Sequence, residues 1–367
     1  MIGHIEVFGV TSCSVQVIWR RQSGSSTIEI GGQSTTVSGP AAVGAWQASG
    51  LEPDAAVDIT VDGRVITTVR TFPTLGTVTA KVATISDLHL GEESFAFLPR
   101  SQVPTRDHAD ICLQAALQEI VAWQPDLLIV KGDIAHRPSP TVYERFAEAI
   151  AETGLQTVIL SGNHDGGNHH GVSMVDALER VGLELTRNMA VVDLPNLRVI
   201  GANSMIVGAG AGGMTAHHDV LHAAASASGG VLVATHHQFM KHNVPVYWPP
   251  GIPARHGHRF LDSLAEAHPH TVVTSGHTHR NRVRRHGPLV LSEVGSTKDF
   301  PGAWAGYTAG AEGIVQSVRR ISSPAALCWT ESTRSAVLGV WGRWSAGALT
   351  DRSFFHRWLQ PAAEPAA

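Results

Sequence analysis

Hydrophobic and polar positions alternate over residues 1–76, as at Val15 and Val17. A period of two places every second side chain on one face of a strand, so this stretch predicts short strands with one buried face. Asp62 and Gly63 separate two such runs, and glycine readily adopts the positive φ that a tight hairpin requires. We therefore expect a small all-β sandwich domain over residues 1–76. A β-layer packed into the main domain is the alternative.

From Thr79 the pattern changes to short apolar runs that alternate with helical periodicity. Such runs predict buried strands, and their alternation with amphipathic helices is typical of an α/β domain. We assign this domain to residues 77–358 and expect the tail, residues 359–367, to be disordered. The predicted strands cover residues 82–86, 127–131, 157–161, 197–202, 231–235, 271–275 and 289–293.

Two predicted helices lie between the first three of these strands. Apolar residues recur at helical spacing from Ile111 to Val121, which indicates an amphipathic helix that covers a sheet. Ser139 and Pro140 provide an N-cap and a first-turn proline for the second helix. The segment 205–230 is rich in Gly, Ala and His and predicts a loop with a short helix near the functional site.

Length and composition are those of an ordinary globular chain. The 367 residues exceed the usual single-domain length of about 100–200, and 43% are hydrophobic against 16% charged. No apolar run approaches the ~20 residues that span a bilayer, and the start MIGHIEVFGV lacks the pattern of a secretory signal. We therefore expect no transmembrane segment, no membrane partner and a cytoplasmic location.

Charge and cysteine content argue against a nucleic-acid-binding protein and against a fold held by disulfides or cysteine-ligated zinc. The formal net charge of −4 gives no basic field for a nucleic-acid backbone, so a long polynucleotide is disfavoured as a partner. The three cysteines are odd in number and far apart, which fits neither a disulfide framework nor a cysteine-ligated zinc site. Histidine stands out at 21 residues and favours metal or proton chemistry, although surface positions explain most of them.

Residues suited to metal binding follow five of the predicted strands. In open α/β sheets, ligands bind at the carboxyl ends of the strands. A single Asp-x-His or Gly-Asp motif can form a turn as readily as a pair of metal ligands. Turn formation alone, however, does not require a carboxylate, amide or imidazole at every one of these strand ends. The sequence therefore predicts a metal site. Its motifs are Asp87-Leu88-His89, Gly132-Asp133, Gly162-Asn163-His164-Asp165, Thr235-His236 and Gly276-His277-Thr278-His279.

This order of motifs resembles the calcineurin-like metallophosphoesterase superfamily, whose signature runs DxH, GD, GNH(D/E), H and GHxH. The match extends from residue 79 to about residue 300. The resemblance implies a four-layer α/β/β/α domain with a centre of two divalent or mixed-valence metal ions. Such oxygen and nitrogen donors suit Mn, Fe, Zn or Co, and the metal identity stays open. The implied ligands are Asp87, His89 and His279 for one metal, Asn163, His236 and His277 for the other, and Asp133 as the bridge.

The resemblance also implies a mechanism. Two close cations lower the pKa of a shared water, so that a metal-bound hydroxide near neutral pH attacks the phosphate ester. His164 follows the ligand Asn163 and is expected to protonate the leaving oxygen or stabilise the transition state; a surface position is its plainer interpretation. Asp165 is expected to orient the imidazole of His164.

Further sequence strings resemble particular branches of this superfamily. Trp19, the run Gly50-Leu51-Glu52-Pro53 and the string TFPTLG are similar to the fibronectin type III sandwich that precedes the catalytic domain of purple acid phosphatases. His136 in GDIAH stands where those enzymes carry a metal-bound tyrosine. The strings LSGNHD, ATHHQ and GHTHR look most like the bacterial cyclic-nucleotide phosphodiesterase and glycerophosphodiesterase branch. Gln238 and Phe239 replace the prolines of the HHPP string common there.

Other histidines and the tryptophans have plainer interpretations. His237 would point away from its neighbour if the strand pleat continues, and the histidines in polar segments are expected on the surface. We favour a core or interface role for the C-terminal tryptophans, with a stacking surface for a base as the alternative. The histidines set aside are His169, His170, His217, His218 and His237, and the tryptophans are Trp329, Trp341, Trp344 and Trp358.

The sequence thus predicts a metal-dependent phosphoesterase. We expect it to hydrolyse a small phosphodiester, such as a cyclic nucleotide or a glycerophosphodiester. A phosphomonoesterase is the runner-up, a non-catalytic binding protein on the same fold is the alternative from another class, and a nuclease is a third. The expected partner is a small phosphate ester, and a homodimer is left open.

Overall fold

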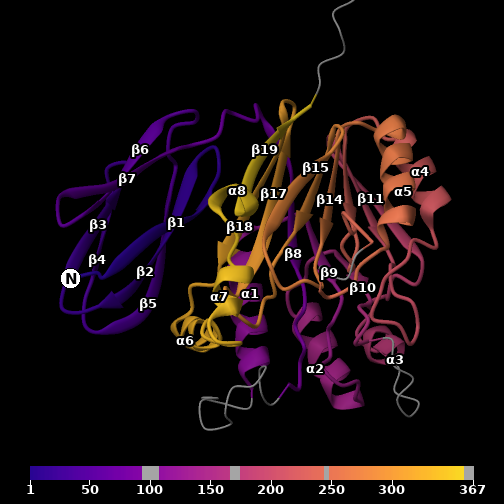
Figure 1. Ribbon diagram of the computed structural model, residues 1–367, viewed down its shortest axis with the longest axis horizontal. Helices are drawn as coiled ribbons and strands as arrows, with labels where there is room; N and C mark the ends of the chain where they lie inside the picture. Colours follow the sequence, from indigo (N-terminus) through magenta and orange to yellow (C-terminus); the bar gives the residue numbers. More distant parts are fainter. Residues whose placement is uncertain (93–106, 166–173, 244–247, 359–367) are drawn as a thin grey trace, which may run out of the picture.

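The computed structural model describes residues 1–92, 107–165, 174–243 and 248–358 (Figure 1). Its first strands form two antiparallel sheets, of three strands in the order β1-β2-β5 and of four in the order β4-β3-β6-β7. These strands are β1 His4–Val10, β2 Ser14–Gln22, β3 Ser26–Ile30, β4 Gln33–Val37, β5 Ala41–Ser49, β6 Ala56–Val61 and β7 Arg64–Arg70.

The two sheets enclose a core of their own. Val15 and Val17 of β2 and Ile28 and Ile59 of the other sheet are fully buried in one apolar cluster. A sheet buries the alternate residues that face its partner, which accounts for the period of two in the sequence. The all-β sandwich is therefore confirmed, rather than a layer packed into the main domain.

The predicted hairpin is present between β6 and β7. Val61 pairs with Arg64, and both intervening residues have positive φ, 49° for Asp62 and 77° for Gly63. Two such residues in succession form the tight turn that matches the twist of antiparallel strands. The Asp62 carboxylate also accepts a hydrogen bond of 2.8 Å from the backbone N–H of Thr27 on β3.

The remaining strands form two six-stranded sheets, in the orders β10-β9-β8-β17-β18-β19 and β11-β12-β13-β14-β16-β15. The first contains β8 Val78–Ile85, β9 Leu127–Lys131, β10 Thr157–Leu160, β17 Ala303–Gly310, β18 Gly313–Arg320 and β19 Ser353–Arg357. The second contains β11 Met189–Leu194, β12 Leu197–Ala202, β13 Gly230–Ala234, β14 Thr271–Ser275, β15 Arg282–His286 and β16 Leu289–Glu293. All seven sequence-predicted strands are present.

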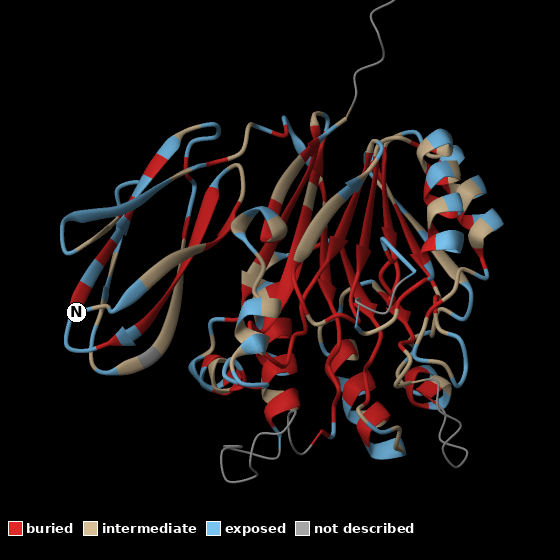
Figure 2. Cartoon of the chain, in the orientation of Figure 1, coloured by how far each residue is buried: buried red, intermediate tan, exposed pale blue. Residues whose placement is uncertain are grey.

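Helices cover the outer faces of these two sheets, and buried residues such as Val82 and Leu232 fill the space between them. Figure 2 shows the central strands buried and the helices exposed on their outer sides. The predicted four-layer α/β/β/α domain is therefore confirmed. Packed on the first sheet are α1 His108–Trp123, α2 Pro140–Ala151, α3 Met174–Glu179 and α6 Pro324–Thr333. On the second are α4 His217–Ala225 and α5 Ala254–Ala267. The short helices α7 Val340–Trp344 and α8 Leu349–Arg352 follow α6.

Two helix predictions can be compared in detail. Helix α2 begins as expected, with Pro140 in its first turn and the Ser139 hydroxyl accepting a hydrogen bond of 3.3 Å from the Val142 N–H. Helix α1 buries most of the expected stripe, including Ile120, but Val121 is 43% exposed, and Cys112, which lies outside that stripe, is fully buried.

The sandwich packs directly on the α/β/β/α domain, and β1–β7 lie on the opposite side of the two large sheets from α4 and α5 (Figure 1). Gln16 on β2 exchanges two hydrogen bonds of 2.9 Å with the backbone of Arg320 on β18. We retain residues 1–76 and 77–358 as proposed domains, and the predicted tail 359–367 lies outside the described residues. Within the described ranges no helix is long and apolar enough to cross a membrane.

Candidate metal centre

The five motifs meet at one edge of the two large sheets. Parallel pairing of β8, β9 and β10, and separately of β13 and β14, brings the carboxyl ends of these strands together. Backbone hydrogen bonds then join the loops: the Asp87 N–H donates to Gly132 O at 3.0 Å, and the His89 N–H to Asp133 O at 2.9 Å. On the second sheet, the Gly276 N–H donates to His236 O at 2.9 Å. Backbone hydrogen bonds therefore join neighbouring ligand loops within each sheet.

Five of the seven predicted ligands have a left-handed backbone. This conformation costs a residue with a side chain about 1–3 kcal/mol, and it persists where the surrounding structure imposes it. Such strain gathers at functional sites because it aims side chains in directions that a regular strand end does not allow. The φ values are 55° for Asp87, 44° for His89, 51° for Asp133, 67° for His277 and 51° for His279.

Two glycines of the motifs are required by close approach. A Cβ at Gly162 would lie 2.1 Å from Oδ1 of Asp133, and a Cβ at Gly276 would lie 1.8 Å from Oγ of Ser86. Both distances are far below van der Waals contact, and the neighbouring groups are buried. Glycine in GNH and in GHxH therefore lets two loops come close to the carboxylates of Asp133 and Asp87.

Asp87, His89 and His279 form the first group of donors. Their ligand atoms all lie within 4.8 Å of one another. Nε2 of His89 and Nε2 of His279 are 3.1 Å apart, and Nε2 of His279 is 3.5 Å from Oδ1 of Asp87. Two imidazole nitrogens and a carboxylate oxygen converge on one point, which is the donor arrangement of a cation site.

His236 and Asn163 belong to the second group. Nε2 of His236 lies 3.2 Å from Oδ1 of Asn163 and 3.4 Å from Oδ1 of Asp133. The other oxygen of Asp133, Oδ2, is 3.7 Å from Nε2 of His89 in the first group. Asp133 thus turns one oxygen to each group, as the bridging prediction requires. Asp87 also lies within 4.8 Å of Asp133 and His236.

Two of these imidazoles are oriented through their other ring nitrogen. His236 donates from Nδ1 to the carbonyl of Lys131 at 2.7 Å, and His279 donates from Nδ1 to Oδ2 of Asp299 at 2.7 Å. These bonds leave Nε2 of each ring for a metal. Asp299 lies 20 residues beyond His279 in sequence. The sequence analysis missed it because no motif marks it.

The carboxylates also set the proton affinity of these rings. Burial disfavours the imidazolium form of His236, but the charge of Asp133 outweighs it and raises the pKa of His236 to about 9. Burial likewise opposes the charged form of His279, and Asp299 and Asp87 raise the pKa of His279 to about 9. The site is electronegative enough to hold cations.

His277 is anchored differently from the other ligands. Its backbone N–H donates to both oxygens of Asp87 at 3.0 Å, and its Nε2 donates to the carbonyl of Pro250 at 3.2 Å. Burial, followed by the nearby His236, lowers the pKa of His277 to about 3, so the ring is neutral. A neutral imidazole can donate a lone pair to a metal.

His164 and Asp165 both lie at the centre, but they do not form the expected pair. Nδ1 of His164 donates to the carbonyl of His136 at 3.2 Å, and its backbone N–H donates to Oδ1 of Asp133 at 2.9 Å. The carboxylate of Asp165 instead accepts hydrogen bonds from the backbone N–H groups of Gly162, Ile134 and Ala135, at 2.9–3.1 Å. It therefore braces the loop that carries Asp133.

The histidines that were not expected to be ligands fall into three groups in the structure. His237 is buried with its ligand atom within 4.8 Å of those of His236 and His277, so it belongs to the centre spatially. Its Nδ1 accepts from the Ser204 hydroxyl at 3.0 Å, a long-range contact with no signal in the sequence. His217 and His218 lie on α4, where His217 is partly exposed and His218 is exposed. His169 and His170 lie outside the described residues.

An open cavity of about 900 Å³ adjoins the centre. Predicted ligands form part of its lining, together with His164, and two of the C-terminal tryptophans, Trp341 and Trp344, form another part. Trp329 is buried in the core, and Trp358 lies against Gly230. Trp329 therefore has the expected core role, and Trp341 and Trp358 also pack, partly buried, against the apolar clusters of the core. Trp248, which the sequence analysis did not consider, also lines the cavity.

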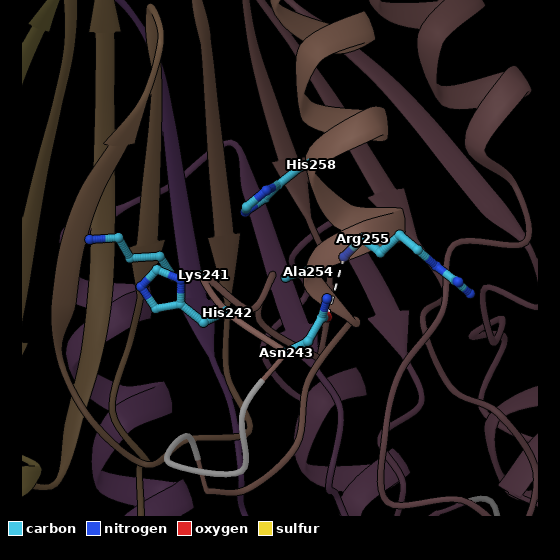
Figure 3. Close-up of a pocket in the computed structure, with 6 residues that line it drawn as sticks. All are labelled: Lys241, His242, Asn243, Ala254, Arg255 and His258. Atoms are coloured by element: carbon cyan, nitrogen blue, oxygen red, sulfur yellow. Dashed lines mark hydrogen bonds between the residues drawn. The ribbon is translucent and has the colours of Figure 1, made fainter.

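A second cavity, of about 690 Å³, lies at the start of α5 and has a different character (Figure 3). The Asn243 side chain there accepts a hydrogen bond of 3.4 Å from the Arg255 backbone N–H. Among the described residues, its lining includes no carboxylate and no predicted ligand. Its lining residues are Lys241, His242, Asn243, Ala254, Arg255 and His258. The metal chemistry therefore belongs to the first cavity.

Comparison with known proteins places this site in a family. The family model described as calcineurin-like phosphoesterase matches residues 80–281, more than half of the chain. A probable cyclic nucleotide phosphodiesterase of Psychrobacter arcticus is 24% identical over 229 residues, which cover 59% of this chain and 79% of that protein.

Solved structures are similar at lower identity. A dimetal phosphatase from Danio rerio is 12% identical with a TM-score of 0.51, covering 66% of this chain and 97% of that one. A purple acid phosphatase from yellow lupin is 13% identical with a TM-score of 0.47, covering 87% of this chain and 72% of that one. The first of these likenesses supports the fold, and the family model covers all five motifs. The chain therefore belongs to the calcineurin-like phosphoesterase family.

Proposed function

We propose that this protein hydrolyses a small phosphodiester at a centre of two metal ions. Family membership makes a phosphoester hydrolase the general expectation, and the preference for a diester is the specific proposal. One observation supports the metal centre above the others: Nε2 of His89 and Nε2 of His236, which follow strands of different sheets, face different oxygens of Asp133. A structural ion pair would not need imidazoles from two separate sheets around one buried carboxylate.

The donor set fits two cations. We assign one to the group of Asp87, His89 and His279, the other to Asn163, His236 and His277, with Asp133 shared between them. Mixed carboxylate, amide and imidazole donors suit Mn, Fe, Zn or Co, and the buried Asp133 offsets the repulsion between neighbouring positive charges. When bound, such a pair supplies Lewis acidity at the phosphoryl oxygens and a water activated near neutral pH.

His164 is the proposed acid for the leaving group. Its side chain lines the cavity beside Asn163, and its Nδ1 is held by the carbonyl of His136. That bond leaves Nε2 to point at a substrate, where it can protonate the departing oxygen or stabilise the transition state. Asp165 is a proposed positioning residue, since it fixes the backbone of residues 134 and 135 next to the bridging Asp133.

A substrate panel tests the proposal. Phosphomonoesters, phosphodiesters and cyclic nucleotides would be assayed with protein reconstituted with Mn, Zn or Fe, and the metal content of each preparation measured. We expect kcat/KM to be highest for a diester. A higher value for every monoester would favour a phosphomonoesterase, and bound metals without turnover of any ester would favour a binding protein.

A further inference from the structure

One wall of the metal-centre cavity is aromatic, and none of its members belongs to the five motifs. Trp248 comes from the segment between β13 and α5, after the fourth motif, and Trp341 and Trp344 come from α7. Ligand groups such as His89 and Asn163 line the same cavity. The two on α7 lie beyond residue 281, where the family match ends.

The two tryptophans on α7 are held against the metal centre. Nε1 of Trp344 donates to the carbonyl of Thr278, between two predicted ligands, at 3.3 Å. The ring of Trp341 lies edge-on to the imidazole of His279, with 5.8 Å between the ring centroids. The polar edges of both indoles therefore face the protein, and ring surface borders the cavity.

Apolar side chains of this wall are unusually exposed to solvent. Trp248 is 77% exposed and Val340, which also lines the cavity, is 56% exposed. Exposed apolar surface gathered at the rim of a polar site marks a place where a ligand or partner is bound. A polyol would cover it poorly, because each hydroxyl would lose its water without a hydrogen-bonding partner on an indole face.

We propose that this wall binds a planar, uncharged aromatic group of the substrate, such as a nucleobase, while the phosphate sits at the metal centre. The inference rests on the proposed function and narrows it, since it favours a nucleotide diester over a glycerophosphodiester. A quaternary ammonium headgroup is disfavoured even though such groups bind tryptophan, because the Arg280 guanidinium already lies 4.2 Å from the Trp344 ring.

A matched pair of ligands tests the role of the wall. Adenosine 5′-monophosphate and ribose 5-phosphate share the phosphate and sugar and differ only in the base. Their binding to manganese-loaded protein would be measured by calorimetry and by inhibition of bis(4-nitrophenyl) phosphate hydrolysis. Stacking of a base on an aromatic side chain predicts that the nucleotide binds about 5- to 150-fold more tightly.

The variant Trp248→Ala should reduce this ratio toward one and leave the affinity for ribose 5-phosphate unchanged. Trp344→Ala should act in the same direction, with metal content measured to detect any shift of Thr278. Leu338→Ala is the matched control, since this side chain is 103% exposed in the same segment as Trp341 and does not line the cavity.

The outcomes separate this inference from the proposed function. A ratio near one in the wild type, or an unchanged ratio in Trp248→Ala, overturns the aromatic wall even if diesters are hydrolysed. Phosphocholine binding that weakens in the same variant would also overturn it, in favour of a cationic headgroup. If no ester is hydrolysed, the proposed function fails, and the calorimetric ratio still decides the role of the wall.

Discussion

Trp341 donates a hydrogen bond from Nε1 to Oδ1 of Asp299 at 3.2 Å. The other oxygen of the same carboxylate accepts from Nδ1 of the predicted ligand His279 at 2.7 Å. One buried carboxylate therefore connects an aromatic residue of the cavity wall to the metal centre. The donor side chains on both sides fix the rotamer of Asp299, and Asp299 in turn fixes the ring orientation of His279.

Asp299→Asn should weaken metal binding at the group of Asp87, His89 and His279. The amide carries no charge to support the Nδ1–H of His279, and loss of such a partner typically costs about 10- to 100-fold in metal affinity. Metal titration followed by elemental analysis checks this. Asp262→Asn is the matched control, because Asp262 accepts from His286 at the same 2.7 Å but is exposed. Equal losses in both variants would contradict the prediction.

Asp133→Asn should weaken metal binding at both positions and abolish turnover. Replacing the shared carboxylate removes the negative charge that offsets repulsion between two close cations. We expect elemental analysis to find less than half of the wild-type metal. Full metal content with near-normal kcat would exclude Asp133 as the bridge.

His164→Ala should retain the metals and lose activity in a way that depends on the leaving group. A missing general acid typically costs ~10²–10⁴ in rate, and the loss shrinks for a leaving group that departs without a proton. We would compare kcat for a nitrophenyl diester and an alkyl diester, with metal content measured in parallel. Equal losses on both substrates would favour phosphate positioning instead.

Metal uptake by the metal-free protein should release protons. Because the pKa values of His236 and His279 are raised to about 9, both rings are protonated below that pH and a cation must displace the proton. Apparent affinity should therefore rise as the pH increases toward 9, by up to about tenfold per pH unit for each proton displaced. Calorimetry of manganese binding in buffers of different ionisation enthalpy measures the protons released; a pH-independent affinity without proton release would contradict this assignment.

Arg20→Met should destabilise the junction between the sandwich and the catalytic part. The buried guanidinium donates to Glu331 on α6 at 2.7 Å and to Glu6 at 2.9 Å, and its loss leaves carboxylates with fewer partners. We expect a decrease of about 1–3 kcal/mol in the free energy of unfolding. Arg70→Met is the control, because its pair with Asp54 is exposed and should contribute nothing measurable. Equal denaturation midpoints for the two variants would count against a structural role for the junction.

The sequence by itself determined the local elements and the chemistry of the motifs. The period of two specified the strands of the sandwich, and Asp62-Gly63 specified a hairpin, because both depend on neighbouring residues. Buried parallel strands ended by polar residues specified where the ligands lie, since the carboxyl ends of such strands meet at one edge. Gly162 and Gly276 belong to motifs that the sequence displays, although only the structure gives the close contacts that require them.

Only the tertiary structure decided which distant residues complete the centre. Asp299, Ser204 and Trp248 contact or border the site across long sequence separations, and no periodicity or spacing marks them. The partners of Asp165 also depend on the tertiary structure. The adjacent His164 was its expected partner, but its carboxylate accepts hydrogen bonds from backbone N–H groups some 30 residues earlier in the chain. Side-chain direction at a strand end follows from loop packing and left-handed backbone geometry, which are consequences of the whole fold rather than of local sequence.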